Sequence, residues 1–305
     1  MLVGGCASPG IQRPAQPLAE IELASVPFHP QSRYQCGPAA LATVLGWSGR
    51  EISPETLKPR VYVPERQGTL QPEVKAAARA EGRLAYPLQR HVDALLAELD
   101  AGHPVLVMQN LGLSWLPQWH YAVVVGTAAT PARVILRSGR ERRRVTPLET
   151  FLRTWRRAEH WALVVLPPGR MPATAEPLPY LRAASELEGT AGPEAAIPAY
   201  RAGVGRWPDD ERLVLALANA QYDNGQRRVA MKTLRDAVEG RHGDSAMLLN
   251  NLAMVAAELG RWRAAERALD RGLALGGAHQ ETLRRTRTEI RCMRSGRAPD
   301  GCESR

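Results

Sequence analysis

The chain has 305 residues, of which 44% are hydrophobic and 23% are charged, a composition that supports buried cores and argues against disorder. Its 40 Lys and Arg outnumber 31 Asp and Glu, so the formal net charge of +9 favours anionic neighbours. No stretch reaches the roughly 20 consecutive apolar residues that a membrane-spanning helix needs, which excludes a multi-pass membrane protein.

Residues 1–22 contain a possible export signal. The small residues directly before Cys6 resemble the lipobox of bacterial lipoproteins, in which that cysteine is lipidated and becomes the N-terminus. A signal peptide also needs a basic start and an apolar run of about 7–15 residues, whereas only five residues precede Cys6. Either translation starts upstream or this is an ordinary terminus. We expect a lipoprotein of the cell envelope, facing the periplasm or the exterior, with the acyl chain on Cys6 as its only membrane contact.

Helix and strand signals alternate through residues 23–168. A helix is expected over 36–45, because Gly37-Pro38 opens a run of apolar residues at helical spacing and proline suits a first helical turn. Further helices are expected over 71–81 and 91–101. Short apolar, β-branched runs predict strands over 104–108, 121–126, 133–136 and 161–166. Together they predict an α+β domain with a small, mostly antiparallel sheet.

A Pro-rich linker over 169–178 precedes an Ala- and Leu-rich region over 179–293 that has no strand pattern. This region repeats itself, since a small residue followed four positions later by a large apolar one recurs at periods of 34 and 35 residues, as Ala196/Tyr200, Ala230/Leu234 and Ala265/Leu269. The pattern resembles three tetratricopeptide repeats, with a polar capping helix over 279–293; a generic helical bundle is the alternative. Residues 294–305 form a polar tail, and Cys292 and Cys302 would close a small loop in an oxidising compartment.

The segment around Cys36 carries the strongest chemical signal. A cysteine at a helix N-terminus is expected to have a lowered thiol pKa, because unpaired backbone N–H groups stabilise the thiolate. A nucleophilic cysteine also needs an oxyanion donor and a base. Gln31 lies five residues upstream and has a side-chain N–H to offer. His120 begins an apolar strand between two aromatic residues, which makes it the best candidate base; the alternative is a histidine that only packs there.

In this order, the Gln31, Cys36-Gly37-Pro38 and His120-Tyr121 segments resemble the papain-like peptidases of cysteine peptidase family thirty-nine. The family is best known for bacteriocin-processing peptidases that cut after double glycine. The resemblance covers about residues 26–166 and implies a papain-like fold. It also implies that Cys36 is the nucleophile, His120 the general base and acid, and Gln31 the oxyanion donor.

One position departs from the family pattern. Members usually carry an Asp at the end of the strand after the histidine strand, where it orients the imidazole, and Ser138 stands there in this chain. A hydroxyl can accept the imidazole N–H, but it stabilises an imidazolium less than a carboxylate does. Asn110 is a possible substitute. Three outcomes are therefore open: catalysis is weakened, another group orients His120, or catalytic activity is lost.

Two further features have a structural and a functional interpretation. Arg137, Arg140 and the run Arg142 to Arg144 predict either a solvated hairpin or a surface for acidic substrates or an anionic membrane. Trp115 and Trp119 either line a substrate cleft or pack in the core.

These patterns predict a cysteine peptidase that acts on a peptide or protein through a Cys36 thioester and binds a protein partner through the helical repeats. An inactive, peptide-binding adaptor and an acyltransferase of similar geometry are the alternatives. No metal or cofactor is predicted, since no Cys-x2-Cys pair occurs. Nucleic acid is not an expected partner, because only 5% of residues are aromatic and the basic charge is spread over both domains.

Overall fold

A computed structural model describes residues 13–31, 35–63 and 68–296. They form two compact units, residues 1–191 and 192–305, which are considered separately. Cys6 and Cys302 lie outside the described residues, so their predicted lipidation and loop closure stay predictions. No helix in the described part of the chain is both long enough and apolar enough to cross a membrane.

The first unit is built on an antiparallel sheet with strand order β4-β9-β5-β6-β7-β8, to which β1 (Ile21–Glu22) adds by pairing with β6. The strands are β4 (Leu84–Pro87), β5 (Val105–Asn110), β6 (Trp119–Ala128), β7 (Arg133–Ser138), β8 (Glu141–Pro147) and β9 (Ala162–Leu166). A separate ribbon joins β2 (Tyr62–Val63) to β3 (Gly68–Thr69). The predicted α+β class is therefore confirmed, and the strand order brings β6 and β7 side by side.

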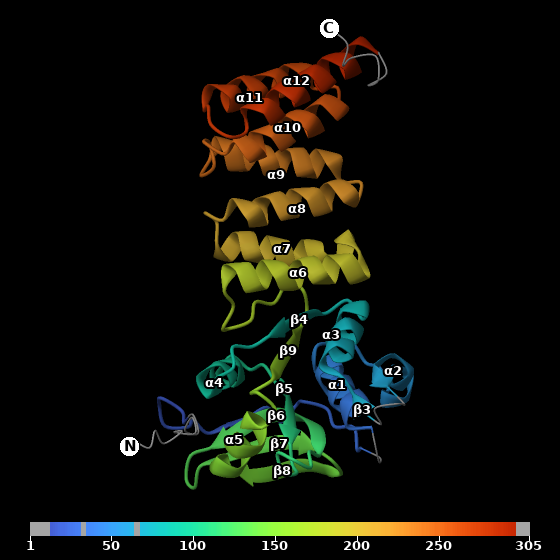
Figure 1. Cartoon of the computed structure of the whole chain (residues 1–305), viewed down its shortest axis with the longest axis vertical. Helices are drawn as coiled ribbons and strands as arrows, with labels where there is room; N and C mark the ends of the chain where they lie inside the picture. The colour runs from blue at the N-terminus through green and yellow to red at the C-terminus, as the bar shows by residue number, and fades with distance from the viewer. Residues whose placement is uncertain (1–12, 32–34, 64–67, 297–305) are drawn as a thin grey trace, which may run out of the picture. The chain divides into compact units, whose positions relative to one another are not determined.

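Helices cover this sheet. They are α1 (Cys36–Trp47), α2 (Pro54–Val61), α3 (Gln71–Ala80), α4 (Val92–Asp100) and α5 (Leu148–Arg156). Figure 1 shows α1, α2 and α3 on one side of β9 and β5, with α4 on the other. The core between α1 and the sheet joins Leu41 and Leu45 of α1 to Tyr121, Val123 and Val125 of β6.

The two compact units divide after residue 191, whereas the start of the repeats at residue 179 stays a prediction. We assigned residues from 179 onward to the repeats, but α6 (Pro177–Ala191) groups with the first unit. This helix contacts α3 and β4, and Arg79 of α3 forms an ion pair with Glu186 of α6. Helical periodicity shows that α6 has an apolar face, but it does not say which partner covers that face.

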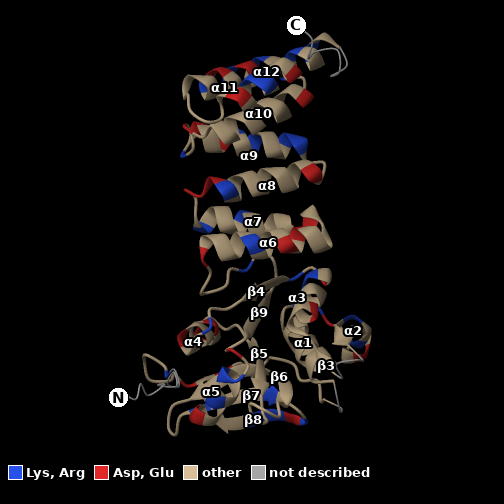
Figure 2. Ribbon diagram, in the orientation of Figure 1, with Lys and Arg blue, Asp and Glu red and all other residues tan. Residues whose placement is uncertain are grey.

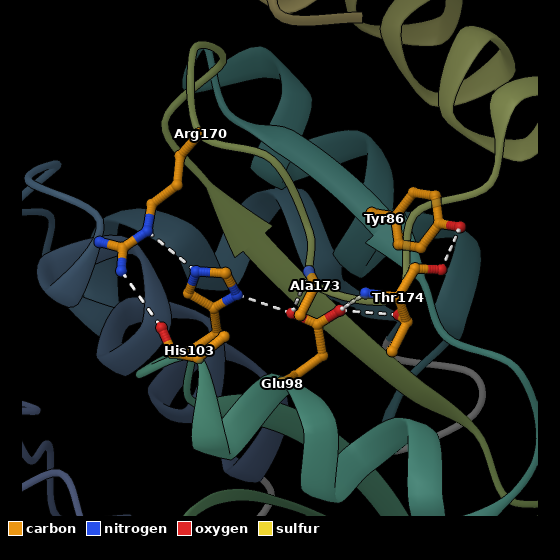
Figure 3. A network of polar contacts seen from close by, with 7 residues as sticks. Tyr86, Glu98, His103, Arg170, Ala173 and Thr174 are labelled. Atoms are coloured by element: carbon orange, nitrogen blue, oxygen red, sulfur yellow. Dashed lines mark hydrogen bonds and ion pairs between the residues drawn. The ribbon is translucent and has the colours of Figure 1, made fainter. Parts of the chain in front are cut away.

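A buried polar network holds the chain leading to α6 (Figure 3). Glu98 of α4 is 0% exposed and accepts hydrogen bonds from the backbone N–H groups of Ala173 (3.1 Å) and Thr174 (2.8 Å). His103 Nδ1 lies 2.6 Å from the same carboxylate, and Arg170 donates to His103 Nε2 at 2.9 Å. Through these bonds to Glu98 and His103, residues 170–174 of the predicted linker are fixed to the first unit.

The second unit is entirely helical, with α7 (Pro193–Arg206), α8 (Glu211–Asp223), α9 (Arg227–Glu239), α10 (Ala246–Glu258), α11 (Trp262–Ala274) and α12 (Gln280–Ser295). Consecutive helices pack against each other (Figure 1). The three predicted pairs of small and large apolar residues are all buried, in α7, α9 and α11. Gly225 and Gly260 have φ values of +74° and +69°, left-handed conformations that glycine adopts without strain. The predicted repetition of helical hairpins is therefore present.

Candidate active site

Cys36 is the first residue of α1, and its surroundings fix where the helix begins. Gln35 precedes it with φ −112° and ψ 20° and makes no side-chain cap. Gly37 follows, and a Cβ at Gly37 would lie 2.3 Å from Thr69 Oγ1, so only glycine leaves room for β3 there. Thr69 thus packs against the first turn of α1, next to the thiol.

Gln31 and Cys36 both meet the backbone of Tyr121 in β6. The Gln31 side chain donates to the Tyr121 carbonyl at 3.3 Å, and the Gln31 backbone N–H donates to the Gly139 carbonyl at 2.8 Å. The backbone of Tyr121 also hydrogen-bonds the Cys36 sulfur. The structure therefore brings Gln31 and Cys36 together at Tyr121, the residue that follows His120 in β6. Gly139, which accepts the Gln31 N–H, directly follows β7.

His120 and Ser138 form the other half of the site. His120 Nε2 lies 2.8 Å from Ser138 Oγ, because β6 and β7 pair directly and both side chains lie on one face of the sheet. Ser138 is only 3% exposed. Among the described residues this is the only hydrogen bond of the His120 ring, so Nδ1 is left for another partner.

The electrostatics differ from the expected thiolate. Burial raises the pKa of the Cys36 thiol above its ordinary value, although the backbone hydrogen bonds from Tyr121, Gly37 and Cys36 itself act in the opposite direction. Burial, together with the nearby cationic Arg144, lowers the pKa of His120 to about 4. The expectation of a lowered thiol pKa is therefore wrong, because loss of hydration outweighs the helix terminus. At neutral pH the Cys36 thiol and the His120 imidazole are therefore both neutral.

Other predicted residues have different roles. Asn110 Oδ1 accepts from the N–H groups of Gly112 and Gln118, both at 2.9 Å, so this side chain organises the loop after β5. Arg137 is buried and donates to backbone carbonyls, including that of Arg142 at 2.7 Å. Trp115 and Trp119 are 78% and 52% exposed, so the interpretation that they pack in the core is wrong.

Two residues near Cys36 were not predicted as part of the site. Thr69 Oγ1 is buried without a hydrogen-bond partner among the described residues, and the Thr69 carbonyl accepts from the Tyr121 hydroxyl at 3.2 Å. Tyr121 is 2% exposed and packs edge-on against Trp161. The sequence signal was the aromatic residue directly after His120, but its contact with Thr69 depends on the tertiary fold.

The arrangement does not involve a metal cluster in the described residues. Across residues 13–31, 35–63 and 68–296, no three His, Cys, Asp or Glu side chains come close enough to hold a metal ion. A thiol and an amide donor meet at the backbone of Tyr121, and the Nε2 atom of the preceding residue, His120, is fixed by Ser138. These are the groups that acyl transfer through a thiol requires.

The first unit thus has the papain-like α+β fold of the cysteine peptidases. Residues 23–163 match the Peptidase_C39 like family. No curated protein matches the chain.

Two solved structures are similar to about half of this chain. One is a C39-like peptidase from Bacillus anthracis, with 17% sequence identity, coverage of 48% of this chain and 98% of that chain, and a TM-score of 0.43. The other is a double glycine motif protease from an AMS/PCAT transporter in complex with the leader peptide, with 22% identity, coverage of 50% and 98%, and a TM-score of 0.36.

Proposed function

We propose that the first unit is a cysteine peptidase that cleaves a peptide or protein through a Cys36 thioester. The observation that carries this proposal is the meeting of Cys36 and Gln31 at the backbone of Tyr121, next to a His120 ring whose Nε2 is held by Ser138. The match of residues 23–163 to a peptidase family supports the same chemistry.

In the acylation step, His120 Nδ1 takes the proton from the Cys36 sulfur as the sulfur attacks the carbonyl carbon of the scissile bond. The carbonyl oxygen becomes an oxyanion, which the backbone N–H groups at the start of α1 and one N–H of Gln31 stabilise. Gln31 Nε2 has two hydrogens, so it can donate to the oxyanion while keeping the bond to the Tyr121 carbonyl. The C–N bond then breaks, and the departing amine takes the proton from His120.

Deacylation reverses these roles. A water molecule gives a proton to His120 Nδ1 and attacks the thioester carbonyl, and the tetrahedral intermediate expels the Cys36 sulfur, which recovers the proton. Ser138 holds the ring in place through Nε2 in both steps. Because the group that holds Nε2 is a hydroxyl and not a carboxylate, we expect slow turnover compared with a complete triad.

The proposal is tested by exposing the full chain to a complex peptide mixture and identifying new termini by mass spectrometry. Cys36→Ser should abolish the new termini, and His120→Ala should reduce their rate of appearance by about a hundredfold or more. Ser48→Ala provides a matched control, because this serine lies at the other end of α1. Equal cleavage by parent and Cys36→Ser would contradict the proposal.

A second candidate function is a non-enzymatic adaptor that binds peptides in the same site. It is favoured by the raised pKa of the Cys36 thiol and by Ser138 in place of an acid. The adaptor predicts that peptides are retained by the chain without turnover and that Cys36→Ser retains them equally well. Detection of a Cys36 thioester by mass spectrometry would exclude it.

For the second unit, we propose tetratricopeptide-type repeats that bind a protein partner. The buried small and large apolar pairs of α7, α9 and α11 support this assignment. We also propose export of the chain and anchoring through an acyl chain on Cys6. Metabolic labelling with a fatty-acid analogue, lost in Cys6→Ser, tests the anchor.

A further inference from the structure

An apolar hairpin extends from the sheet beside the candidate site. It comprises residues 111–119, between β5 and the start of β6, and contains no charged residue. Among the described residues, five of the ten exposed large hydrophobic side chains lie in it: Leu111 (42% exposed), Leu113 (49%), Trp115 (78%), Leu116 (64%) and Trp119 (52%). Such a concentration of exposed apolar side chains marks an interaction surface.

The backbone of the apolar hairpin satisfies much of its own hydrogen bonding. The N–H of Leu111 donates to the Gln118 carbonyl at 2.9 Å, and that of Leu113 to the Leu116 carbonyl at 3.1 Å. Asn110 accepts from Gly112 and Gln118 and donates to the Leu113 carbonyl at 3.4 Å. A backbone satisfied in this way can enter an apolar medium at low cost, whereas a loop hydrated by water cannot.

Cationic side chains flank the base of the apolar hairpin. Arg157, which follows α5, donates to the Gly112 carbonyl at 2.7 Å, and α5 is tied to the end of β5 by the bond from Gln109 to Thr154 at 2.7 Å. Arginines lie on α5 and along the β7–β8 hairpin (Figure 2). In the described part of the chain, Arg157, Arg153 of α5 and Arg142 of β8 form no ion pair with a carboxylate.

We propose that the apolar hairpin inserts into the interface of an anionic lipid bilayer. Trp and Leu are suited to the boundary between headgroups and acyl chains, and the arginines at the base match the charge of anionic headgroups. A peptide in the candidate site would meet Trp119, next to His120. The most exposed side chains, Trp115 and Leu116, lie instead at the tip, where the Leu113–Leu116 turn reverses the chain. Insertion into a bilayer accounts for the exposure of Trp115 and Leu116 at the tip. It would also hold the first unit at a membrane surface without a spanning helix.

Vesicle co-sedimentation tests this proposal with the full chain carrying Cys6→Ser, so that no acyl chain contributes. We expect binding to vesicles of phosphatidylcholine and phosphatidylglycerol in equal amounts, weaker binding to phosphatidylcholine alone, and weakening by salt. Trp115→Ser with Leu116→Ser should lower the partition coefficient by about tenfold or more. The matched control is Leu178→Ser with Leu275→Ser, exposed apolar residues elsewhere, which should bind like the parent.

Two results would overturn the proposal. One is a parent that does not bind the anionic vesicles, and the other is a hairpin variant that binds them as well as the parent does. If the variant with unchanged vesicle binding also fails to retain peptides held by the parent, the apolar hairpin belongs to a peptide cleft instead. Circular dichroism confirms that the variants are folded.

Discussion

Ser138 Oγ lies 2.8 Å from His120 Nε2, so a neutral hydroxyl holds the imidazole at the position where the family resemblance led us to expect a carboxylate. The contact fixes the ring but adds no negative charge beside it. Burial of the ring and, to a lesser extent, the charge of Arg144 lower the pKa of His120 to about 4. The site therefore contains a buried thiol and a fixed imidazole, but Ser138 supplies no charge that would favour the protonated form of the imidazole.

Replacing Ser138 should separate the effect of holding the His120 ring in place from the effect of a negative charge beside it. Ser138→Asp places a carboxylate beside Nε2, which stabilises the imidazolium and raises the pKa of His120. We expect the rate of Cys36 alkylation below neutral pH to rise by about tenfold or more, measured by mass spectrometry of the Cys36 peptide. Ser138→Asn, which is neutral and of similar size to Asp, is the control and should remain close to the parent. Equal rates for the Asp and Asn variants would show that charge at this position is unimportant.

Arg144 provides an independent test of the same electrostatics. Its charge lowers the pKa of His120, second to burial, so Arg144→Gln should shift that pKa upward from about 4. Below the shifted value the ring is protonated, and above it the ring is neutral. NMR titration of the His120 ring measures the shift directly. Arg143→Gln is a suitable control because Arg143 is paired with Glu22; an identical shift in both variants would contradict a specific effect of Arg144.

Local patterns predicted the parts of this site that depend on neighbours in the chain. Gly37-Pro38 placed the start of α1 at Cys36, and the apolar run after His120 placed β6. The contact between His120 and Ser138 followed from two successive strands that pair. The start of α1, the position of β6 and the contact between His120 and Ser138 all depend on residues close together in the sequence, and all three are present in the structure.

The features that could not be predicted depend on burial and on distant segments. The thiol pKa rises because the fold buries Cys36, which its position at a helix start does not show. The run from Arg142 to Arg144 lies in β8, an edge strand whose residues 141–144 are all exposed, so it lacks the alternation of a half-buried strand. The partner of α6 is likewise set by tertiary contacts.

Gly37 should be intolerant of a side chain because of Thr69. A Cβ at Gly37 would lie 2.3 to 2.7 Å from three atoms of the Thr69 side chain, so Gly37→Ala forces β3 or α1 to move. We expect a loss of about 1–3 kcal/mol in the free energy of unfolding and altered alkylation of Cys36. Thr69→Gly removes all three clashing atoms, so the double variant should recover much of the loss in a double-mutant cycle. Additive effects of the two substitutions would rule out this contact as the cause.

The Glu98 network should make the first unit sensitive to acid. Burial alone would raise the pKa of Glu98, but the hydrogen bonds from His103, Thr174 and Ala173 outweigh it and hold the pKa below the ordinary value of 4.5. A carboxyl group with a lowered folded-state pKa stabilises the fold fully above its unfolded-state pKa, and this contribution is lost as pH falls through the folded-state value. We therefore expect the stability of the first unit to decline below the ordinary pKa of Glu98, as measured by denaturant unfolding across pH.

Glu98→Gln removes the charge while retaining much of the shape of the side chain. It should lower the free energy of unfolding at neutral pH by about 3 kcal/mol or more, because the remaining buried partners lose their acceptor, and it should flatten the decline in acid. Amide exchange of Ala173 and Thr174, whose N–H groups bond the carboxylate, should accelerate. Glu159→Gln is the control, because Glu159 forms an exposed ion pair with Arg90 and exposed pairs contribute little. If both variants lost the same stability, the segment over 170–174 would be held by something other than Glu98.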